Sequence, residues 1–203
     1  MQLVKPTPSH IPSYINALKR GWHDLPKGST DQHIRSKLAE ISEDSAQFLS
    51  LFDDPQAKAL PYLLPDQTVA YAVPSLRRWI WDETSNEYCG TISLRWQNGT
   101  TELPPHLMGH VGYTVVPWLQ NKGCASFALS EILKLANHQG LPFIQIVTDI
   151  DNLASIRVIE KNGGTLIETF TKPLMYGAGT ANRYQILCVK QGHSKFQISP
   201  REH

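Results

Sequence analysis

The sequence predicts an α/β fold of the α+β class, in which a mixed, mostly antiparallel sheet is flanked by helices. Apolar residues recur at helical spacing in much of residues 1–60, whereas from residue 78 onward strand-like segments of β-forming residues take turns with amphipathic segments. The chain has 203 residues, of which 41% are hydrophobic, which is enough to bury the core of one ordinary domain. With no internal repeat and no break in composition, residues 1–203 are predicted to form a single domain.

The N-terminal part is predicted to be helical. Apolar residues at helical spacing predict one helix over residues 11–18, with Gly21 as its end. A second helix contains residues 34–41 and follows the potential capping residues 29–31. Residues 60–74 contain three prolines, so they are predicted either as a loop over the sheet or as irregular strand.

Three strands are predicted between residues 78 and 117. The segments 79–81 and 88–96 are rich in β-forming residues, and the turn signal Asn98-Gly99 follows the second of them. In residues 109–117 apolar and polar residues alternate until Pro117 ends the strand.

The C-terminal part predicts a helix, a strand, a second helix and two final strands. An amphipathic helix follows Pro117 and ends before Gly140. A strand is predicted over residues 143–150 and a short helix over 153–162. Residues 166–170 and 183–190 complete the order β-β-β-α-β-α-β-β.

The charge balance argues against two classes of partner. Nineteen basic and eighteen acidic residues give a formal net charge of +1, which lacks the excess of positive charge typical of proteins that bind nucleic acid or anionic membranes. No apolar run is long enough to span a membrane, and residues 1–6 do not resemble a secretion signal. We therefore expect a cytoplasmic protein.

The cysteines and histidines do not predict a metal site. Cys89, Cys124 and Cys188 are three in number and widely spaced, which suits neither a disulfide framework nor a zinc motif, so they are predicted to be reduced thiols. His106 and His110 stand four residues apart. Gly109 and the prolines before it oppose the helix that would align two imidazoles, so no metal is expected.

The segment Gln120-Asn121-Lys122-Gly123-Cys124-Ala125 lies between a predicted strand and an amphipathic helix. The first N–H groups of a helix lack partners within the helix, and the positive end of the helix dipole lies beside them, so they form a cradle for a phosphate or pyrophosphate. The small Gly123 allows the ligand to approach the backbone closely. The segment matches neither the Walker loop nor the dinucleotide fingerprint.

This segment resembles the acyl-CoA loop of the GCN5-related N-acetyltransferases (the GNAT family), written Arg/Gln-x-x-Gly-x-Gly/Ala, which Gln120, Gly123 and Ala125 match. The preceding residues 113–117 are similar to the family's splayed strand. Residues 151–163 look like the Asn-x-x-Ser then Glu-Lys-x-Gly signature of its ribosomal-protein-acetylating and small-substrate branch. The resemblance is close over residues 109–164, the expected acetyl-CoA-binding core.

The resemblance implies a central sheet with splayed strands and a site for acetyl-CoA. It implies main-chain contacts from Val115 and Val116 to the pantetheine arm, and N–H contacts from residues 120–125 to the pyrophosphate. Asn152 and Ser155 would hydrogen-bond the pantetheine arm. The implied loop residues are Gln120, Asn121, Lys122, Gly123, Cys124 and Ala125.

Two positions depart from the family pattern. Ile159 stands where many members have the tyrosine that protonates the leaving thiolate, so the acid is not identified. Gly164 replaces an aromatic residue, which is expected to loosen the packing beneath the site.

Attack of an amine on a thioester needs a base, often through water. His110 on the third predicted strand is one candidate, because imidazole titrates near neutral pH, and a packed histidine is its alternative. Glu83 and Glu102, near strand ends or in loops, are further candidates, with solvated carboxylates as the alternative.

Other residues have two interpretations each. Tyr113 could face the acetyl group, although core packing is favoured, and a nucleophilic role for Cys124 is disfavoured. The tryptophans 79, 81, 96 and 118 together with the arginines 77, 78 and 95 could line a substrate groove, but core and edge packing is favoured for the tryptophans. Residues 176–180 resemble the region that shapes the family's acceptor pocket.

The predicted function is transfer of an acetyl group from acetyl-CoA to a primary amine of a small molecule or peptide, by direct attack. The alternative is an acyl-CoA-binding regulatory or interaction module without catalysis. RNA binding is disfavoured by the charge. A homodimer stays open.

Overall fold

The computed structural model describes residues 1–23 and 31–188. The chain opens with the short strand β1 (Gln2–Val4), followed by the helices α1 (Ile11–Lys19), α2 (Asp31–Glu43) and α3 (Ser45–Ser50). Asp44 caps α3, because its carboxylate accepts hydrogen bonds from the N–H groups of Ala46 and Gln47. These helices confirm the predicted helical N-terminal part, while the capping residues 29 and 30 lie outside the described residues.

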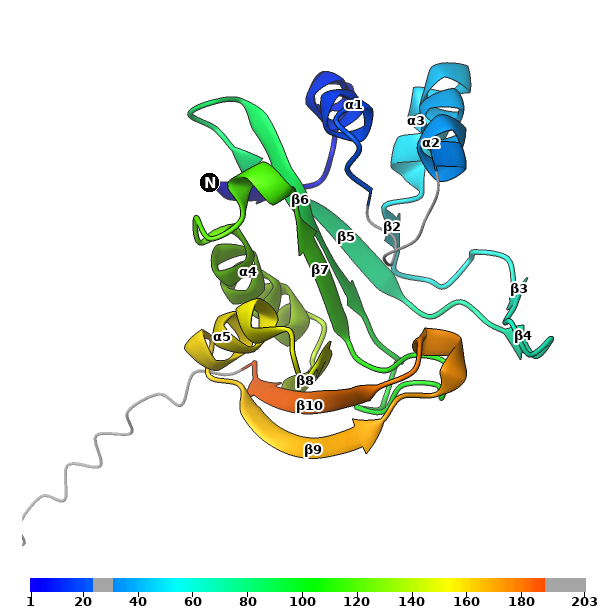
Figure 1. Ribbon diagram of the computed structural model, residues 1–203. Coiled ribbons are helices and arrows are strands. Elements are labelled where there is room, and N and C mark those ends of the chain that lie inside the picture. Colours follow the sequence, from blue (N-terminus) through cyan, green and yellow to red (C-terminus); the bar gives the residue numbers. More distant parts are fainter. Residues whose placement is uncertain (24–30, 189–203) are drawn as a thin grey trace, which may run out of the picture.

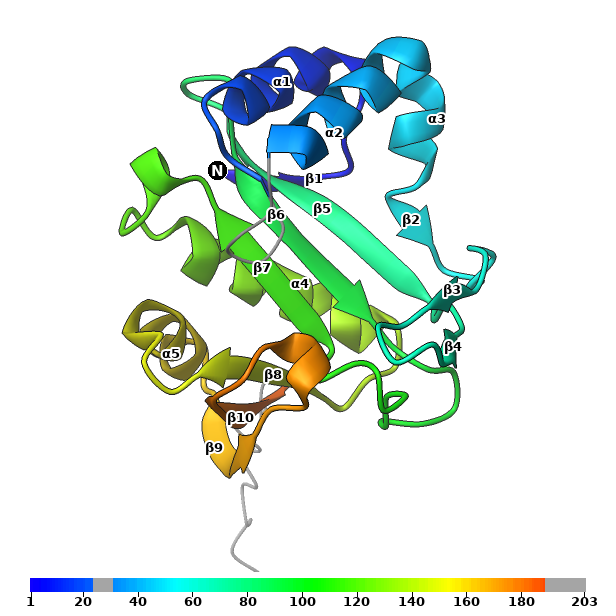
Figure 2. The same ribbon diagram turned by 45° about the vertical axis from the view of Figure 1, so that its right-hand side comes forward.

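The larger sheet has the strand order β1-β5-β6-β7, and every pair in it is antiparallel. Its long strands are β5 (Ser75–Asp82), β6 (Glu87–Arg95) and β7 (Val111–Val115), and the two-residue strand β2 (Asp53–Asp54) pairs with β5. The helices α1–α3 lie over one face of this sheet, and α4 and α5 lie on the opposite side (Figures 1 and 2).

Each face of the large sheet has its own apolar core. On the side of α1–α3, aromatic rings stack and meet edge to face, with Tyr14 packed against Trp79 at 4.6 Å between ring centroids. On the other side, Ile92 and Leu94 of β6 pack against Ala128 and Ile132 of the next helix. Trp79, Trp81 and Trp96 are all buried, so the packing interpretation of these tryptophans is confirmed.

The C-terminal half contains α4 (Cys124–His138), β8 (Phe143–Asp149), α5 (Leu153–Lys161), β9 (Thr165–Thr171) and β10 (Thr180–Leu187). Its three strands form a separate antiparallel sheet in the order β8-β10-β9. The last strand is predicted over residues 183–190, and residues 189 and 190 lie outside the described part of the chain.

The strands β7 and β8 come together at one end and diverge at the other. At the joined end the N–H of His110 donates to the carbonyl of Gln145 at 2.8 Å, and the N–H of Gln145 donates to Nδ1 of His110 at 3.0 Å. Gly109 allows this close approach, because a Cβ there would lie 2.9 Å from the carbonyl oxygen of Gln145. Beyond this point a cavity lies between residues 111–113 and 146–149. The predicted α/β fold, with a mostly antiparallel arrangement of splayed strands flanked by helices, is therefore confirmed; the strand pairs within the described residues are all antiparallel.

Short elements were harder to predict than long ones. Strands β1 and β2 were not predicted, because two or three residues show no periodicity. Residues 60–74, for which the sequence predicts a loop or irregular strand, contain the two-residue strands β3 (Tyr62–Leu63) and β4 (Val69–Ala70), which pair with each other.

Candidate active site

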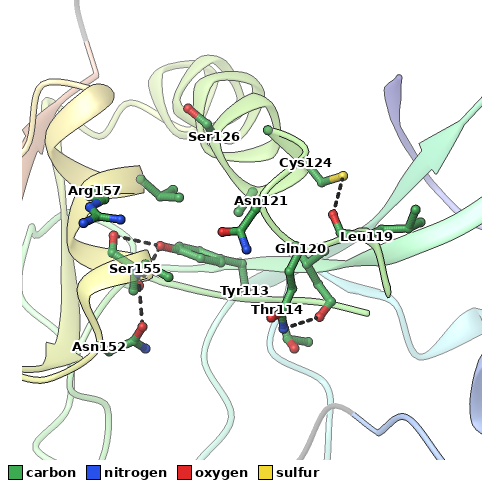
Figure 3. A pocket seen from close by; sticks show the side chains of 15 residues that line it. Tyr113, Thr114, Leu119, Gln120, Asn121, Cys124, Ser126, Asn152, Ser155 and Arg157 are labelled. Atoms are coloured by element: carbon green, nitrogen blue, oxygen red, sulfur yellow. Dashed lines mark hydrogen bonds between the residues drawn. The ribbon is translucent and has the colours of Figure 1, made fainter. Parts of the chain in front are cut away.

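A cleft of about 390 Å³ lies between the end of β7, the loop before α4 and the start of α5 (Figure 3). Most of its wall comes from two segments, the loop and first turn of α4 and the first turns of α5. The lining residues are Tyr113, Thr114, Val115, Leu119, Gln120, Asn121, Gly123, Cys124, Ala125, Ser126, Asn152, Ala154, Ser155, Arg157 and Val158.

The loop before α4 turns through two residues with left-handed backbone angles. Asn121 has φ of 60° and Gly123, the N-cap of α4, has φ of 82°. The first hydrogen bond of the helix runs from the N–H of Phe127 to the carbonyl of Gly123. In the part of the chain that the structure describes, the main-chain N–H groups of residues 121–126 have no hydrogen-bond partner. They are available to an anion, together with the positive end of the helix dipole.

The first turn of α5 holds the opposite wall. Asn152 caps α5 by accepting the N–H of Ser155 at 3.1 Å, which fixes the direction of its amide. The hydroxyl of Tyr113 on β7 lies 2.7 Å from Oγ of Ser155, and Figure 3 shows its ring pointing across the cleft toward α5. Burial raises the pKa of Tyr113, so this hydroxyl keeps its proton at neutral pH. Tyr113 thus lines the cleft, whereas core packing was the favoured expectation.

A second cavity of about 300 Å³ adjoins the cleft in the gap between β7 and β8. Tyr113, Asn152 and Ser155 line both cavities, so they mark the junction. Asp149 and Lys172 face each other on the wall of this second cavity, with Nζ of Lys172 2.5 Å from a carboxylate oxygen.

Eight of the ten residues implied for acetyl-CoA line the cleft; Val116 and Lys122 do not. Val116 is buried, and its N–H donates to the carbonyl of Cys89 at 2.9 Å. Lys122 is exposed on the loop. Ser126, Arg157 and Val158 line the cleft without having been singled out from the sequence, although the latter two lie within the second family-like segment.

None of the three expected base candidates lines the cleft or the second cavity. His110 is buried at the joined end of β7 and β8, where its imidazole accepts the N–H of Gln145. Burial, and to a smaller extent the charge of Arg95, lower the pKa of His110, so the imidazole is neutral. Glu83, in the turn between β5 and β6, and Glu102, in the loop before β7, are exposed.

Two sequence features have a clear structural explanation. Cys124 is buried, and its thiol donates to the carbonyl of Leu119 at 3.5 Å. Burial raises the pKa of this thiol, against the lowering that a helix start alone would cause, so it is a poor nucleophile. The expectation of loose packing at Gly164 is wrong, because a Cβ there would lie 2.4 Å from Cγ2 of the buried Ile159.

Across residues 1–23 and 31–188 no group of three or more His, Cys, Asp or Glu side chains is arranged to hold a metal ion. Within the same ranges, none of the helices has the length and apolar character needed to cross a membrane.

Comparisons with known proteins agree with this geometry. The sequence profile described as "Acetyltransferase (GNAT) domain" matches residues 3–165. No curated protein sequence matches.

Solved structures share the fold. The microcin self-immunity acetyltransferase MccE, in complex with acetyl-CoA and AMP, is 13% identical, with a TM-score of 0.59 and 91% of each chain covered. The ribosomal α-N-protein acetyltransferase RimL, in complex with coenzyme A, is 17% identical, with a TM-score of 0.54 over 91% of this chain and 92% of its own. A mutant spermidine N-acetyltransferase SpeG from Vibrio cholerae is 14% identical, with a TM-score of 0.53 over 93% of this chain and 95% of its own.

The profile match covers most of the chain, and the N–H groups at the start of α4 have no hydrogen-bond partner within the described residues. The protein belongs to the GNAT family of acetyltransferases and is an acyltransferase that uses acetyl-CoA as its acetyl donor.

Proposed function

We propose that this protein transfers the acetyl group of acetyl-CoA directly to a primary amine of its acceptor. The observation that carries the proposal is the row of unpaired N–H groups over residues 121–126, on the wall of a cleft that continues into the gap between β7 and β8. The N–H groups bind the diphosphate of coenzyme A. The pantetheine arm then runs between β7 and Asn152 and brings the thioester to the junction of the two cavities.

Transfer forms a C–N bond and breaks the C–S bond of the thioester. The amine, after losing its ammonium proton, attacks the carbonyl carbon, and the CoA thiolate leaves. The N–H of Val116 donates to β6, and donors alternate in direction along an antiparallel strand. The N–H of Val115 therefore points toward β8, and we assign it to the oxyanion that develops on the carbonyl oxygen.

The proton for the thiolate comes from the hydroxyl pair of Tyr113 and Ser155 at the junction. This pair regains a proton from the attacking nitrogen, which loses its second proton as the C–S bond breaks and the amide forms. Both side chains line both cavities and lie 2.7 Å apart, and burial holds the pKa of Tyr113 above its ordinary value. The phenol of Tyr113 thus takes the role of the tyrosine acid that many family members have at the position of Ile159.

The proton of the ammonium goes to Asp149, directly or through water. Asp149 is the carboxylate among the described residues that line the second cavity, and one of its oxygens lies 2.5 Å from Nζ of Lys172. This assignment takes the place of His110, Glu83 and Glu102, which lie away from both cavities.

Two measurements test the proposal. Isothermal titration with acetyl-CoA tests the cradle, and absence of binding at high micromolar ligand would overturn the assignment. Release of free CoA thiol in the presence of a panel of primary amines tests transfer, because a protein that only binds acyl-CoA shows affinity without thiol production. An Asp149→Asn variant that kept full turnover would refute the role of that carboxylate.

A further inference from the structure

A third cavity of about 300 Å³ lies on the same face of the large sheet as α1–α3, beside the start of β5 and the end of β6. Two arginines, Arg77 of β5 and Arg95 of β6, lie on its wall. In the β5–β6 register Arg77 faces Ser93 and Ser75 faces Arg95, so the two arginines are diagonal neighbours on one face of the sheet. The cavity therefore presents two guanidinium groups from adjacent strands.

The charges of these arginines are not neutralised within the described part of the chain. Neither has a carboxylate within 4.0 Å there, and Nε of Arg95 is buried without a hydrogen-bond partner. Arg78, next in sequence but on the opposite face, does form an ion pair, with Asp53. Burial and the nearby charge of Arg77 both lower the pKa of Arg95. Arg95 is half-buried, with its Nε buried and without a counter-charge beside it. Such an arrangement is costly for a cation, which points to an anion from outside.

The remaining wall suits an organic anion better than a bare ion. Phe52, Tyr62 and Tyr71 contribute aromatic rings, and the guanidinium carbon of Arg77 lies 5.5 Å from the ring centre of Phe52. Asp54 is the carboxylate on this wall. Its two oxygens already accept the N–H groups of Lys58 and Ala59, each at 2.8 Å, so they are held toward that turn.

The arginine pair lies close to the proposed reaction centre. A Cβ placed on Gly112 would lie 3.0 Å from a terminal nitrogen of Arg95, so the guanidinium rests against β7. Gly112 also lines the second cavity, between β7 and β8. The proposed oxyanion donor, Val115, is three residues further along the strand, which at about 3.4 Å per residue is roughly 10 Å away.

We propose that the third cavity binds the anionic end of the acceptor, a phosphate or a carboxylate, while the primary amine of the same molecule reaches the gap between β7 and β8. Its substrates are amines that carry an anionic group roughly 10 Å from the nitrogen. Polycationic amines are excluded by Arg77 and Arg95. This inference rests on the proposed acetyl transfer for its amine end, but the anion site can be tested without turnover.

The test uses four amines of one chain length: aminohexyl phosphate, aminohexanoate, aminohexanol and diaminohexane. We expect kcat/KM for the better of the two anionic amines to exceed that for the alcohol by about tenfold or more, with the diamine below the alcohol, because a charge-assisted hydrogen bond is lost without the anion. The phosphate and carboxylate arms show which anion the arginines prefer. Equal rates for all four, or a preference for the diamine, overturn the proposal.

Variants assign the preference to the arginines. Arg95→Met should abolish the preference, Arg95→Lys should keep part of it, and Arg78→Met, on the other face, should leave it intact. Arg77 is exposed, so Arg77→Met serves as a second variant where Arg95→Met lowers the melting temperature too far.

Calorimetric titration of aminohexyl phosphate into the wild-type protein and the Arg variants, without acetyl-CoA, gives the second readout. Binding that weakens about tenfold in Arg95→Met supports the anion site, even if acetyl-CoA fails to bind and the proposed transfer is abandoned. Unchanged affinity in both Arg77→Met and Arg95→Met, or no binding to the wild type, overturns the anion site while leaving acetyl transfer standing.

Discussion

The loop before α4 allows a test in which the stability cost and the binding cost of one substitution separate. Gly123 has φ of +82°, and a Cβ there would meet no atom within 4 Å. Gly123→Ala therefore causes no clash, and its cost to stability comes from the left-handed backbone, roughly 1–2 kcal/mol. For a chain of this size each kcal/mol lowers the melting temperature by about 2–4 °C.

Gly140, at the other end of α4, provides a matched control. Its φ is +80°, and a Cβ there would also meet nothing within 4 Å, so Gly140→Ala should lower the melting temperature by the same amount. Gly140 does not line the cleft. The two variants thus share the backbone strain and differ in their distance from the proposed diphosphate site.

Binding of acetyl-CoA should distinguish the two variants. In Gly123→Ala the strain of the left-handed backbone favours a relaxed loop whose N–H groups no longer converge. Loss of one charge-assisted hydrogen bond, worth about 1.5–3 kcal/mol, weakens binding by about tenfold or more. Calorimetric titration should show this for Gly123→Ala and wild-type affinity for Gly140→Ala. Equal affinities for the two variants would show that the diphosphate is not held by this loop.

Three further substitutions probe the site and its frame. Tyr113→Phe should lower kcat by about a hundredfold or more without changing the KM for acetyl-CoA, whereas Tyr184→Phe in the core should not; an unchanged kcat in Tyr113→Phe would remove the phenol from the mechanism. For His110, whose pKa is lowered in the folded protein by burial, protonation favours the unfolded chain, so its contribution is complete above about pH 6.5 and declines as the pH falls below that value. Urea titrations at several pH values should show that part of the acid destabilisation missing in His110→Gln, and an identical pH dependence would count against it. Gly90→Ala would bring a Cβ within 2.2 Å of the carbonyl oxygen of Thr114, so the end of β7 should shift, with a stability loss of about 1–3 kcal/mol and weaker acetyl-CoA binding; denaturation and titration that match the wild type would show that the strands adapt.

The long elements and the acetyl-CoA loop could be predicted because their signals are local. The apolar rows of α4 and the alternation in β7 are periodic over many residues, and the loop is marked by residue types within one turn. His110 was predicted on the third strand, but it lies one residue before β7. Its position in the sequence could not show that it joins β7 to β8 through Gln145. The packing at Gly164 was predicted wrongly, because its close contact with Ile159 depends on how the chain turns after α5 and cannot be read from the sequence.

By itself, the sequence determined the order of the long helices and strands, the family resemblance and the cradle at the start of α4. These follow from backbone preferences and helix geometry within a few consecutive residues, which tertiary contacts leave largely unchanged. The tertiary structure alone brought Tyr113 onto Ser155, 42 residues later in the chain, and set Arg95 against Gly112 beside the gap between the strands. The proposed proton transfer and acceptor recognition depend on contacts between segments that are far apart in the sequence. Hydrogen bonds and charge contacts act over a few ångströms in space, whatever the separation along the chain.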